Sequence, residues 1–206
     1  MENFKKIFEG NNSAYGQLIL TGETTEKGKA IGKAFIKREA IPDQLWQDHL
    51  DGKDPALGVI PINEQNMCRW GCIDVDEYNL DHKKLAASIK SHKFPLVMFR
   101  SKSGGAHLFL FTSEFITATL MQAKLKVMSE ALGFEGSEIF PKQTEILVER
   151  GDTGNFLNLP YHGGIRGLRY AMDPEGNAIS LEDFCNNFDN LALTEEQIHE
   201  IVVTKE

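Results

Sequence analysis

Long apolar runs are missing from this sequence. No stretch of about 18 apolar residues occurs, so we expect no membrane-spanning helix and no membrane partner. The first residues, Met1 to Lys6, contain no apolar segment of the kind a secretory signal requires. Cysteine is also scarce: the three thiols are an odd number, and Cys68 and Cys72 have no matching second pair to complete a zinc site. The sequence therefore predicts reduced structural thiols in a cytoplasmic protein.

Basic residues are outnumbered. The chain has 22 Lys and Arg against 30 Asp and Glu, a net charge of −8. Strong non-specific binding to duplex DNA depends on cations that displace phosphate counterions, so this balance disfavours it. A local basic channel is still compatible with the sequence, because Lys and Arg cluster near one Ser- and Gly-rich turn and downstream of it, at Arg100, Lys102, Lys142, Arg150, Arg166 and Arg169.

The remaining composition is that of a globular protein, 41% hydrophobic and 25% charged, and predicts one domain over residues 1–206. Residues 1–40 are polar and Gly-rich, and we expect an irregular lead-in there. Pro42 to Leu50 predicts a short helix, with Pro in its first turn. Leu57 to Ile62 predicts a strand.

The order of elements is clearest from residue 71 onwards. Apolar periodicity predicts alternating strands and helices in the order β-α-β-β-α-β, which is the split unit of ferredoxin-like and RRM-like folds. The expected elements are a strand at 71–77, a helix at 81–92, strands at 96–99 and 106–112, a helix at 116–132 and a strand at 138–142.

The C-terminal region predicts one more strand and then helices. Gly154 to Tyr161 predicts the strand, and Ser180 and Thr194 have the spacing of helix N-caps. We therefore expect an α+β fold: an N-terminal α/β part at 1–65, an RRM-like catalytic core at 66–160 and a helical tail at 161–206.

Two aspartates lie in the first strand of this core. Residues 71–76 read Gly-Cys-Ile-Asp-Val-Asp, and side chains of a strand alternate between its faces. Asp74 and Asp76 should therefore point to the same side, where two like charges repel unless a cation lies between them. A solvated strand end is the simpler explanation of such a pair. The flanking Ile73 and Val75 indicate a half-buried strand instead, and favour a metal or a basic partner.

A Ser- and Gly-rich turn follows about thirty residues later and leads into an apolar strand. Such a turn can simply close a tight hairpin, and a lone strand histidine is often a core residue. The exposed N–H groups of a Gly-rich turn can also bind phosphate oxygens, with the histidine in reach of the same anion. The residues concerned are Arg100, Ser101, Lys102, Ser103, Gly104, Gly105 and His107.

A two-metal phosphoryl-transfer site generally needs a third carboxylate. Glu138 opens the strand Glu-Ile-Phe-Pro-Lys-Gln and is our first candidate, with Glu149 as its rival. Lys142 is either a phosphate or template contact or a solvated edge charge. Asn158 projects from an apolar strand, so it is either a structural hydrogen-bonding centre or a ribose contact.

These segments, in this order, resemble the archaeo-eukaryotic primase superfamily, and most closely the primase-polymerase domains of phages, plasmids and conflict-system operons. The motifs are Ile-Asp-Val-Asp, Ser-x-Ser-Gly-Gly-x-His, Glu-Ile-Phe-Pro-Lys-Gln and Gly-Asn-Phe-Leu-Asn-Leu-Pro-Tyr, and the resemblance covers roughly residues 55–185. The usual third acidic motif, an Asp after an apolar residue, is not found unambiguously.

The resemblance implies an RRM-like catalytic half packed with a second mixed α/β half. It implies that Asp74 and Asp76 hold two Mg²⁺ or Mn²⁺ ions, with Glu138 as our substitute for the third ligand. It also implies that Ser101, Ser103 and His107 bind the phosphates of the incoming nucleotide. The implied partners are nucleoside triphosphates, a single-stranded DNA template and a fused or separate helicase, in the cytoplasm of a prokaryotic or phage-infected cell.

The sequence thus predicts a DNA primase or primase-polymerase, an enzyme that forms phosphodiester bonds from nucleoside triphosphates by two-metal catalysis. A non-catalytic RRM-like module that binds single strands is a second hypothesis, but it leaves the paired aspartates unexplained, since RRMs carry stacking aromatics on the sheet. A metal-dependent nuclease is a third, and the phosphate-binding turn beside the acids makes it less favoured.

Overall fold

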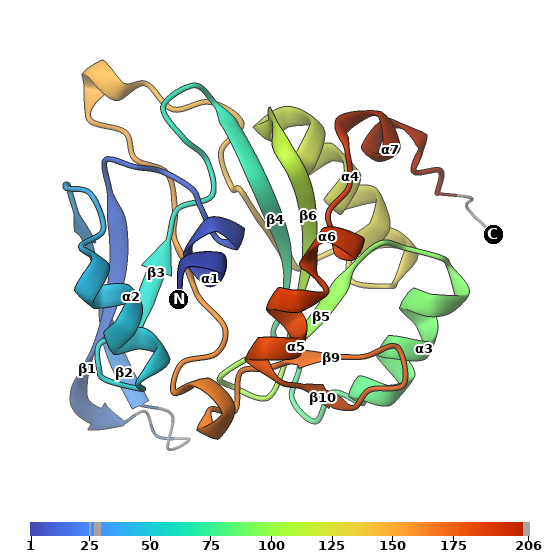
Figure 1. The fold of residues 1–206 in the computed structure, drawn as a ribbon, viewed down its shortest axis with the longest axis horizontal. Helices are drawn as coiled ribbons and strands as arrows, with labels where there is room; N and C mark the ends of the chain where they lie inside the picture. The colour runs from blue at the N-terminus through green and yellow to red at the C-terminus, as the bar shows by residue number, and fades with distance from the viewer. Residues whose placement is uncertain (25, 27–29, 204–206) are drawn as a thin grey trace.

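The computed structural model describes residues 1–24, 26 and 30–203. Two β-sheets organise the described chain, a four-stranded sheet of order β2-β1-β3-β8 and a six-stranded sheet of order β10-β9-β5-β6-β4-β7. In Figure 1 the smaller sheet lies on the left, and the larger sheet lies at the centre with helices on its right flank. None of the described helices is both long and apolar enough to cross a membrane.

The larger sheet contains the expected β-α-β-β-α-β unit. Its elements are β4 (Met67–Val75), α3 (His82–Ser91), β5 (Val97–Arg100), β6 (Ala106–Thr117), α4 (Ala118–Ala131) and β7 (Glu138–Phe140). The spatial order β5-β6-β4-β7 places the first and third strands of the unit at its centre, and all these pairs are antiparallel. This is the arrangement of the split βαβ fold.

Several expected boundaries in this unit are wrong. β4 covers residues 67–75 instead of 71–77, so Asp76 lies just beyond the strand. β6 continues to Thr117 and β7 ends at Phe140, whereas strands at 106–112 and 138–142 were expected. Ile116 does not begin the long helix but still belongs to β6, where it pairs with Cys68 of β4. The helix begins two residues later because the Thr117 side chain accepts a hydrogen bond from the backbone N–H of Leu120. Thr117 is therefore the N-cap, a position that favours a hydroxyl side chain.

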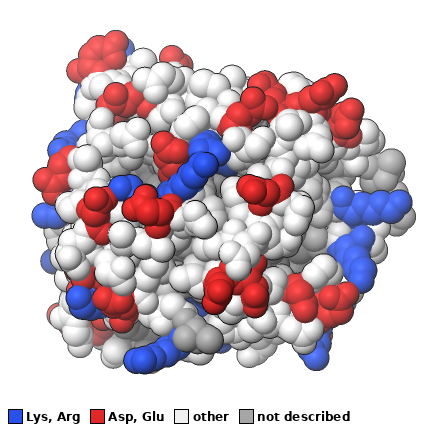
Figure 2. All heavy atoms as spheres, in the orientation of Figure 1, with Lys and Arg blue, Asp and Glu red and all other residues white. Residues whose placement is uncertain are grey.

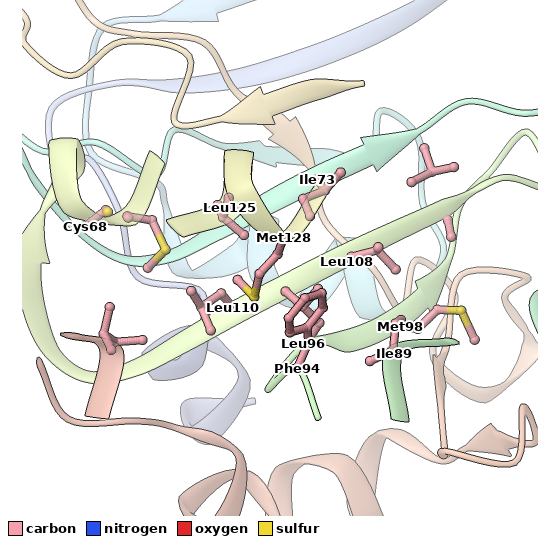
Figure 3. Close-up of a cluster of buried hydrophobic side chains, with 14 of the residues drawn as sticks. Cys68, Ile73, Ile89, Phe94, Leu96, Met98, Leu108, Leu110, Leu125 and Met128 are labelled. Atoms are coloured by element: carbon pink, nitrogen blue, oxygen red, sulfur yellow. The ribbon is translucent and has the colours of Figure 1, made fainter. Parts of the chain in front are cut away.

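Alternation along β4 gives the larger sheet two different faces. Ile73 and Val75 point to the face that α3 and α4 cover, where Figure 3 shows Leu125 and Met128 among the strand side chains. Cys68 belongs to this aliphatic cluster, and burial raises the pKa of its thiol to about 12. Burial of each large apolar side chain of this cluster stabilises the folded state by about 1.5–3 kcal/mol.

The opposite face of the larger sheet is aromatic. Phe8, from the end of α1 (Glu2–Ile7), packs against Phe109 and Phe111 with ring centroids 5.6 and 5.7 Å apart. Phe99 packs on the same cluster and against Phe184 of α5 (Leu181–Asn186), 5.2 Å away. The aromatic rings are thus buried beneath α1 and α5, and Figure 1 shows α1 between the two sheets.

The expected irregular lead-in at residues 1–40 is wrong. This region forms α1 and the antiparallel strands β1 (Tyr15–Thr24) and β2 (Ala30–Lys37). The periodicity that would predict them is weak because the hairpin is exposed on both faces beyond Gln17, so its apolar residues do not alternate with polar ones. The smaller sheet is completed by β3 (Leu57–Val59) and by β8 (Leu157–Asn158), shorter than the expected strands 57–62 and 154–161. The predicted helix after Pro42 is confirmed as α2 (Asp43–Leu50).

The C-terminal region is only partly the expected helical tail. It first adds β9 (Ala171–Met172) and β10 (Ala178–Ile179) to the edge of the larger sheet, where Ala171 pairs with Phe99. These two-residue strands are too short to give a periodic signal. Helices α5, α6 (Phe188–Leu191) and α7 (Glu195–Glu200) follow, and both expected caps are confirmed, with a complete capping box at Thr194.

Candidate active site

The candidate site begins where β4 leaves the larger sheet. Asp74 pairs with His107 of β6 on one side and with Glu138 of β7 on the other. Residues directly opposite on neighbouring strands project to the same face, so these three titratable side chains lie in one row. His107 Nε2 is 3.3 Å from Asp74 Oδ1, with the side chains 14% and 27% exposed. The imidazole therefore lies beside the acid and not on the far side of the sheet.

The Ser- and Gly-rich turn joins β5 to β6 and reaches the second aspartate. Ser103 Oγ donates a hydrogen bond to Asp76 Oδ1 at 3.2 Å, and lies 3.3 Å from the Oγ of the buried Ser101. The turn is closed by backbone bonds from Ser101 N to the Gly105 carbonyl and from Gly104 N to the Ser101 carbonyl. Gly104 has a φ of 90°, which a residue with a side chain rarely adopts.

Close packing holds this turn against the end of β4. A Cβ at Gly105 would lie 2.2 Å from the carbonyl oxygen of Val75, so a side chain there cannot be accommodated without a backbone shift. The Gly105 carbonyl is also 3.0 Å from Nε2 of His82, in the first turn of α3. The turn is thereby fixed between β4 and α3, which keeps its serines beside the aspartates.

These residues line a cleft of about 370 Å³. Seven of the predicted site residues lie along it, namely Asp74, Asp76, Ser101, Lys102, Ser103, His107 and Asn158. Asn158 comes from β8 of the smaller sheet, and its Oδ1 is buried without a hydrogen-bond partner in the described part of the chain. Such an atom is costly to bury and is suited to accept a bond from a ligand.

Glu138 is not brought into the cleft. Although its backbone lies opposite Asp74, its carboxylate is 59% exposed and accepts a hydrogen bond from Lys142 Nζ at 2.8 Å. Among residues 1–24, 26 and 30–203, no three His, Cys, Asp or Glu side chains are grouped so as to hold a metal ion. The rival Glu149 lies exposed in the 3₁₀ turn Val148–Arg150 and is not part of the cleft lining either.

Two other predicted nucleotide contacts are used elsewhere. Arg100 donates from Nη1 to the Leu168 carbonyl at 3.2 Å, and thus braces the neighbouring loop. The Lys142 ammonium, besides its bond to Glu138, lies 5.2 Å from the centroid of the Phe140 ring. Neither residue is part of the cleft lining.

The cleft is also lined by three residues that the sequence did not single out as site residues: Leu18, Leu20 and Arg169. Arg169 was only one member of a basic cluster. The backbone N–H of Tyr161 donates a hydrogen bond to the carbonyl of Arg169 and holds its backbone in place. The Arg169 side chain donates from Nη1 to the Leu159 carbonyl at 3.3 Å. Burial lowers the pKa of its guanidinium, and the charge of Asp54 offsets this in part. No carboxylate of the described residues lies within 4 Å of it.

Comparison with known proteins identifies the family. A family model described as the archaeo-eukaryotic primase domain of the TOTE conflict system matches residues 3–200, a wider span than residues 55–185. The chain belongs to this family. The family is one of primase-polymerase domains, so this archaeo-eukaryotic primase domain has a primase-like, nucleotidyltransferase function in general terms. Comparison with curated proteins gives no match.

A solved structure has the same fold. The primase-polymerase domain of cyanophage S-2L superposes with a TM-score of 0.50 at 8% sequence identity, covering 91% of this chain and 94% of that chain. At this identity the similarity shows the fold alone. The expected α+β class, with an RRM-like core packed against a second mixed part, is thereby confirmed.

Proposed function

We propose that this primase domain is a template-dependent nucleotidyltransferase that forms phosphodiester bonds from nucleoside triphosphates on a single-stranded DNA template. The proposal is carried by one observation. Two aspartates, a histidine and a serine-rich turn from three segments line the same cleft, with Asp74 beside His107 and Asp76 bonded to Ser103.

The donor set of the cleft fits Mg²⁺ or Mn²⁺. Asp74 and Asp76 supply carboxylate oxygens, which these ions prefer, and such ions are often held by one or two carboxylates together with substrate phosphates. The two aspartates would therefore hold the metal, with Glu138 as a third ligand once its carboxylate leaves Lys142. When bound, the metal would supply activation of the attacking hydroxyl and neutralisation of charge on the phosphates.

The remaining cleft residues would bind and orient the triphosphate. The hydroxyls of Ser101 and Ser103 and the imidazole of His107 are hydrogen-bonding groups, and Lys102 and Arg169 supply positive charge, all on the same side as the aspartates. Donors fixed before the reaction stabilise charge that develops on the phosphates, and phosphoryl transfer depends mainly on such positioning. No side-chain nucleophile is needed.

The alternative of a stacking RRM module has less support. RRMs bind bases on exposed aromatics of the sheet, whereas Phe99, Phe109 and Phe111 are fully buried beneath α1 and α5. The polar cleft at the end of β4, in contrast, is open to a ligand.

The proposal is tested by extension of a primed single-stranded template with Mn²⁺ and deoxynucleoside triphosphates. Asp74→Asn and Asp76→Asn should each abolish incorporation and leave the melting temperature and circular dichroism spectrum near those of the wild type. Glu77→Gln is the matched control, since Glu77 follows Asp76 but is exposed outside the cleft lining. Full extension by either Asn variant would remove the proposal. Degradation of the strand without added nucleotide would favour the nuclease instead.

A further inference from the structure

The β1–β2 hairpin places two leucines in an otherwise polar cleft. From this placement we infer that Leu18 and Leu20 form an apolar wall that binds the nucleoside part of the incoming nucleotide by contact alone, without distinguishing among the four bases. The inference rests on the proposed function and adds to it a surface for the base and sugar.

The face of the smaller sheet that carries these leucines is fixed by the strand pairing. Gly16 pairs with Gly58, and Gly58 pairs with Asn158, so these positions share one face. Leu18 and Leu20 follow Gly16 at intervals of two along β1 and therefore belong to the same face. The two leucines and Asn158 accordingly all line the cleft, together with the aspartates of the larger sheet.

The neighbouring strand leaves this wall uncovered. Leu18 pairs with Ala34 and Leu20 with Gly32, so each leucine has a small partner on β2. A Cβ at Gly32 would lie 2.9 Å from Leu18 Cδ1, so that a larger residue would displace the leucine. Leu20 is 43% exposed beside charged groups. Ligand pockets commonly combine apolar side chains with a few placed polar groups, and the two leucines supply the apolar part of this cleft.

The chemistry of the cleft divides a nucleotide into two parts. Serine hydroxyls, basic side chains and aspartates provide the donors and metal ligands that a triphosphate needs, whereas the leucine side chains offer only contact. A leucine has no donor or acceptor with which to read a base edge, and every base presents an apolar face. Selection among bases is then left to pairing with the template.

The test separates the nucleoside from the phosphates. Binding of each of the four deoxynucleoside triphosphates, and of inorganic tripolyphosphate, is measured by calorimetry with Mn²⁺ on the full chain. The variant Leu18→Ala/Leu20→Ala is compared with Ile19→Ala. Ile19 is the matched control because it lies between the two leucines on the opposite face of β1 and is 46% exposed.

We expect the double variant to bind all four nucleotides roughly tenfold more weakly, a loss typical of deleted apolar contacts in a pocket. Its affinity for tripolyphosphate should equal that of the wild type, and Ile19→Ala should bind every probe normally. Unchanged nucleotide binding by the double variant would contradict the inference that the two leucines bind the nucleoside, and would leave the proposed function unaffected. A loss of affinity for only one or two of the four nucleotides would show that the leucines distinguish among bases, contrary to the inference. Failure of the wild type to bind any probe would overturn both proposals.

A converse variant adds bulk to the wall. Gly32→Leu should displace Leu18 toward the cleft, because the new side chain meets it at once. Nucleotide affinity should fall while tripolyphosphate affinity and the melting temperature stay close to wild type. Equal losses for both probes would contradict the inference, since they would mean that the substitution closes the whole cleft.

Discussion

His107 and Asp74 occupy directly opposed positions on β6 and β4, with Nε2 of the imidazole 3.3 Å from Oδ1 of the carboxylate. This pairing fixes the histidine at the mouth of the turn that carries Ser101 and Ser103. The carboxylate orients the imidazole, and thereby keeps its ring nitrogens where the triphosphate is proposed to lie.

Removal of this imidazole should slow incorporation and leave the fold intact. We expect His107→Asn to lower the rate of nucleotide incorporation by about 10²-fold, the usual loss when one charge-stabilising donor is deleted. Primer extension under saturating nucleotide measures this rate. His92→Gln, an exposed histidine at the end of α3, serves as the control. A rate for His107→Asn equal to that of the wild type would show that the imidazole does not act on the phosphates.

Arg169 should contribute mainly to binding of the triphosphate. Its guanidinium is partly buried in the cleft and lacks a carboxylate partner among the described residues, so an anionic ligand would relieve an unfavourable burial. We expect Arg169→Gln to raise KM for nucleotide by roughly 10- to 100-fold, with Arg169→Lys in between, because lysine keeps the charge but loses the planar fork. Arg166→Gln, exposed on the same loop, should leave KM unchanged. An equal rise in KM for Arg169→Gln and Arg166→Gln would mean that the effect comes from the loss of general surface charge and not from a specific contact of Arg169.

Glu138 and Glu149 can be distinguished by their effect on metal requirement. If Glu138 completes the metal site, Glu138→Gln should raise the Mn²⁺ concentration needed for half-maximal incorporation by about tenfold or more, whereas Glu149→Gln should not change it. Lys142→Gln should lower that concentration, because it frees the carboxylate now bonded to the ammonium at 2.8 Å. Metal titrations of primer extension measure all three variants. A shift with Glu149→Gln alone would reverse the assignment.

The sequence predicted those site residues that belong to short local motifs, namely the two aspartates, the serine-rich turn and the histidine. Asp74 and His107 lie on β4 and β6, and Asp76 directly follows β4. Each is a polar residue in or beside a short apolar run, so the local sequence alone singles them out. Leu18, Leu20 and Arg169 come from segments that are remote in the chain, and only strand pairing and one loop bond bring them to the cleft. No local pattern marks them.

Glu138 shows a different limit of sequence reasoning. The sequence selected Glu138 as the third acid, and the structure pairs it with Asp74, but strand pairing does not decide where a flexible side chain points. A lysine four residues later in the chain takes its carboxylate instead. Such competition depends on side-chain contacts beyond the backbone pattern.

Folding stability should fall as the pH drops from about 6.5 to about 4, in part because of His49. This imidazole is fully buried, accepts a hydrogen bond from Leu57 N at Nδ1 and lies 2.7 Å from the Pro160 carbonyl at Nε2. Burial lowers its pKa from 6.5 to about 4, and the nearby charges of His162 and Arg169 act in the same direction. The folded state thus keeps His49 neutral, whereas the unfolded chain binds a proton below pH 6.5.

The stability that neutral His49 contributes is therefore complete above pH 6.5 and is lost as the pH falls toward 4. The loss is about 3 kcal/mol, since each unit of pKa difference is worth about 1.4 kcal/mol. Urea unfolding between pH 7 and 4 measures it. His49→Gln cannot titrate, so its free energy of unfolding should decline less steeply over this range, whereas the exposed His92→Gln should follow the wild type. Parallel curves for wild type and His49→Gln would show that His49 is not the group responsible.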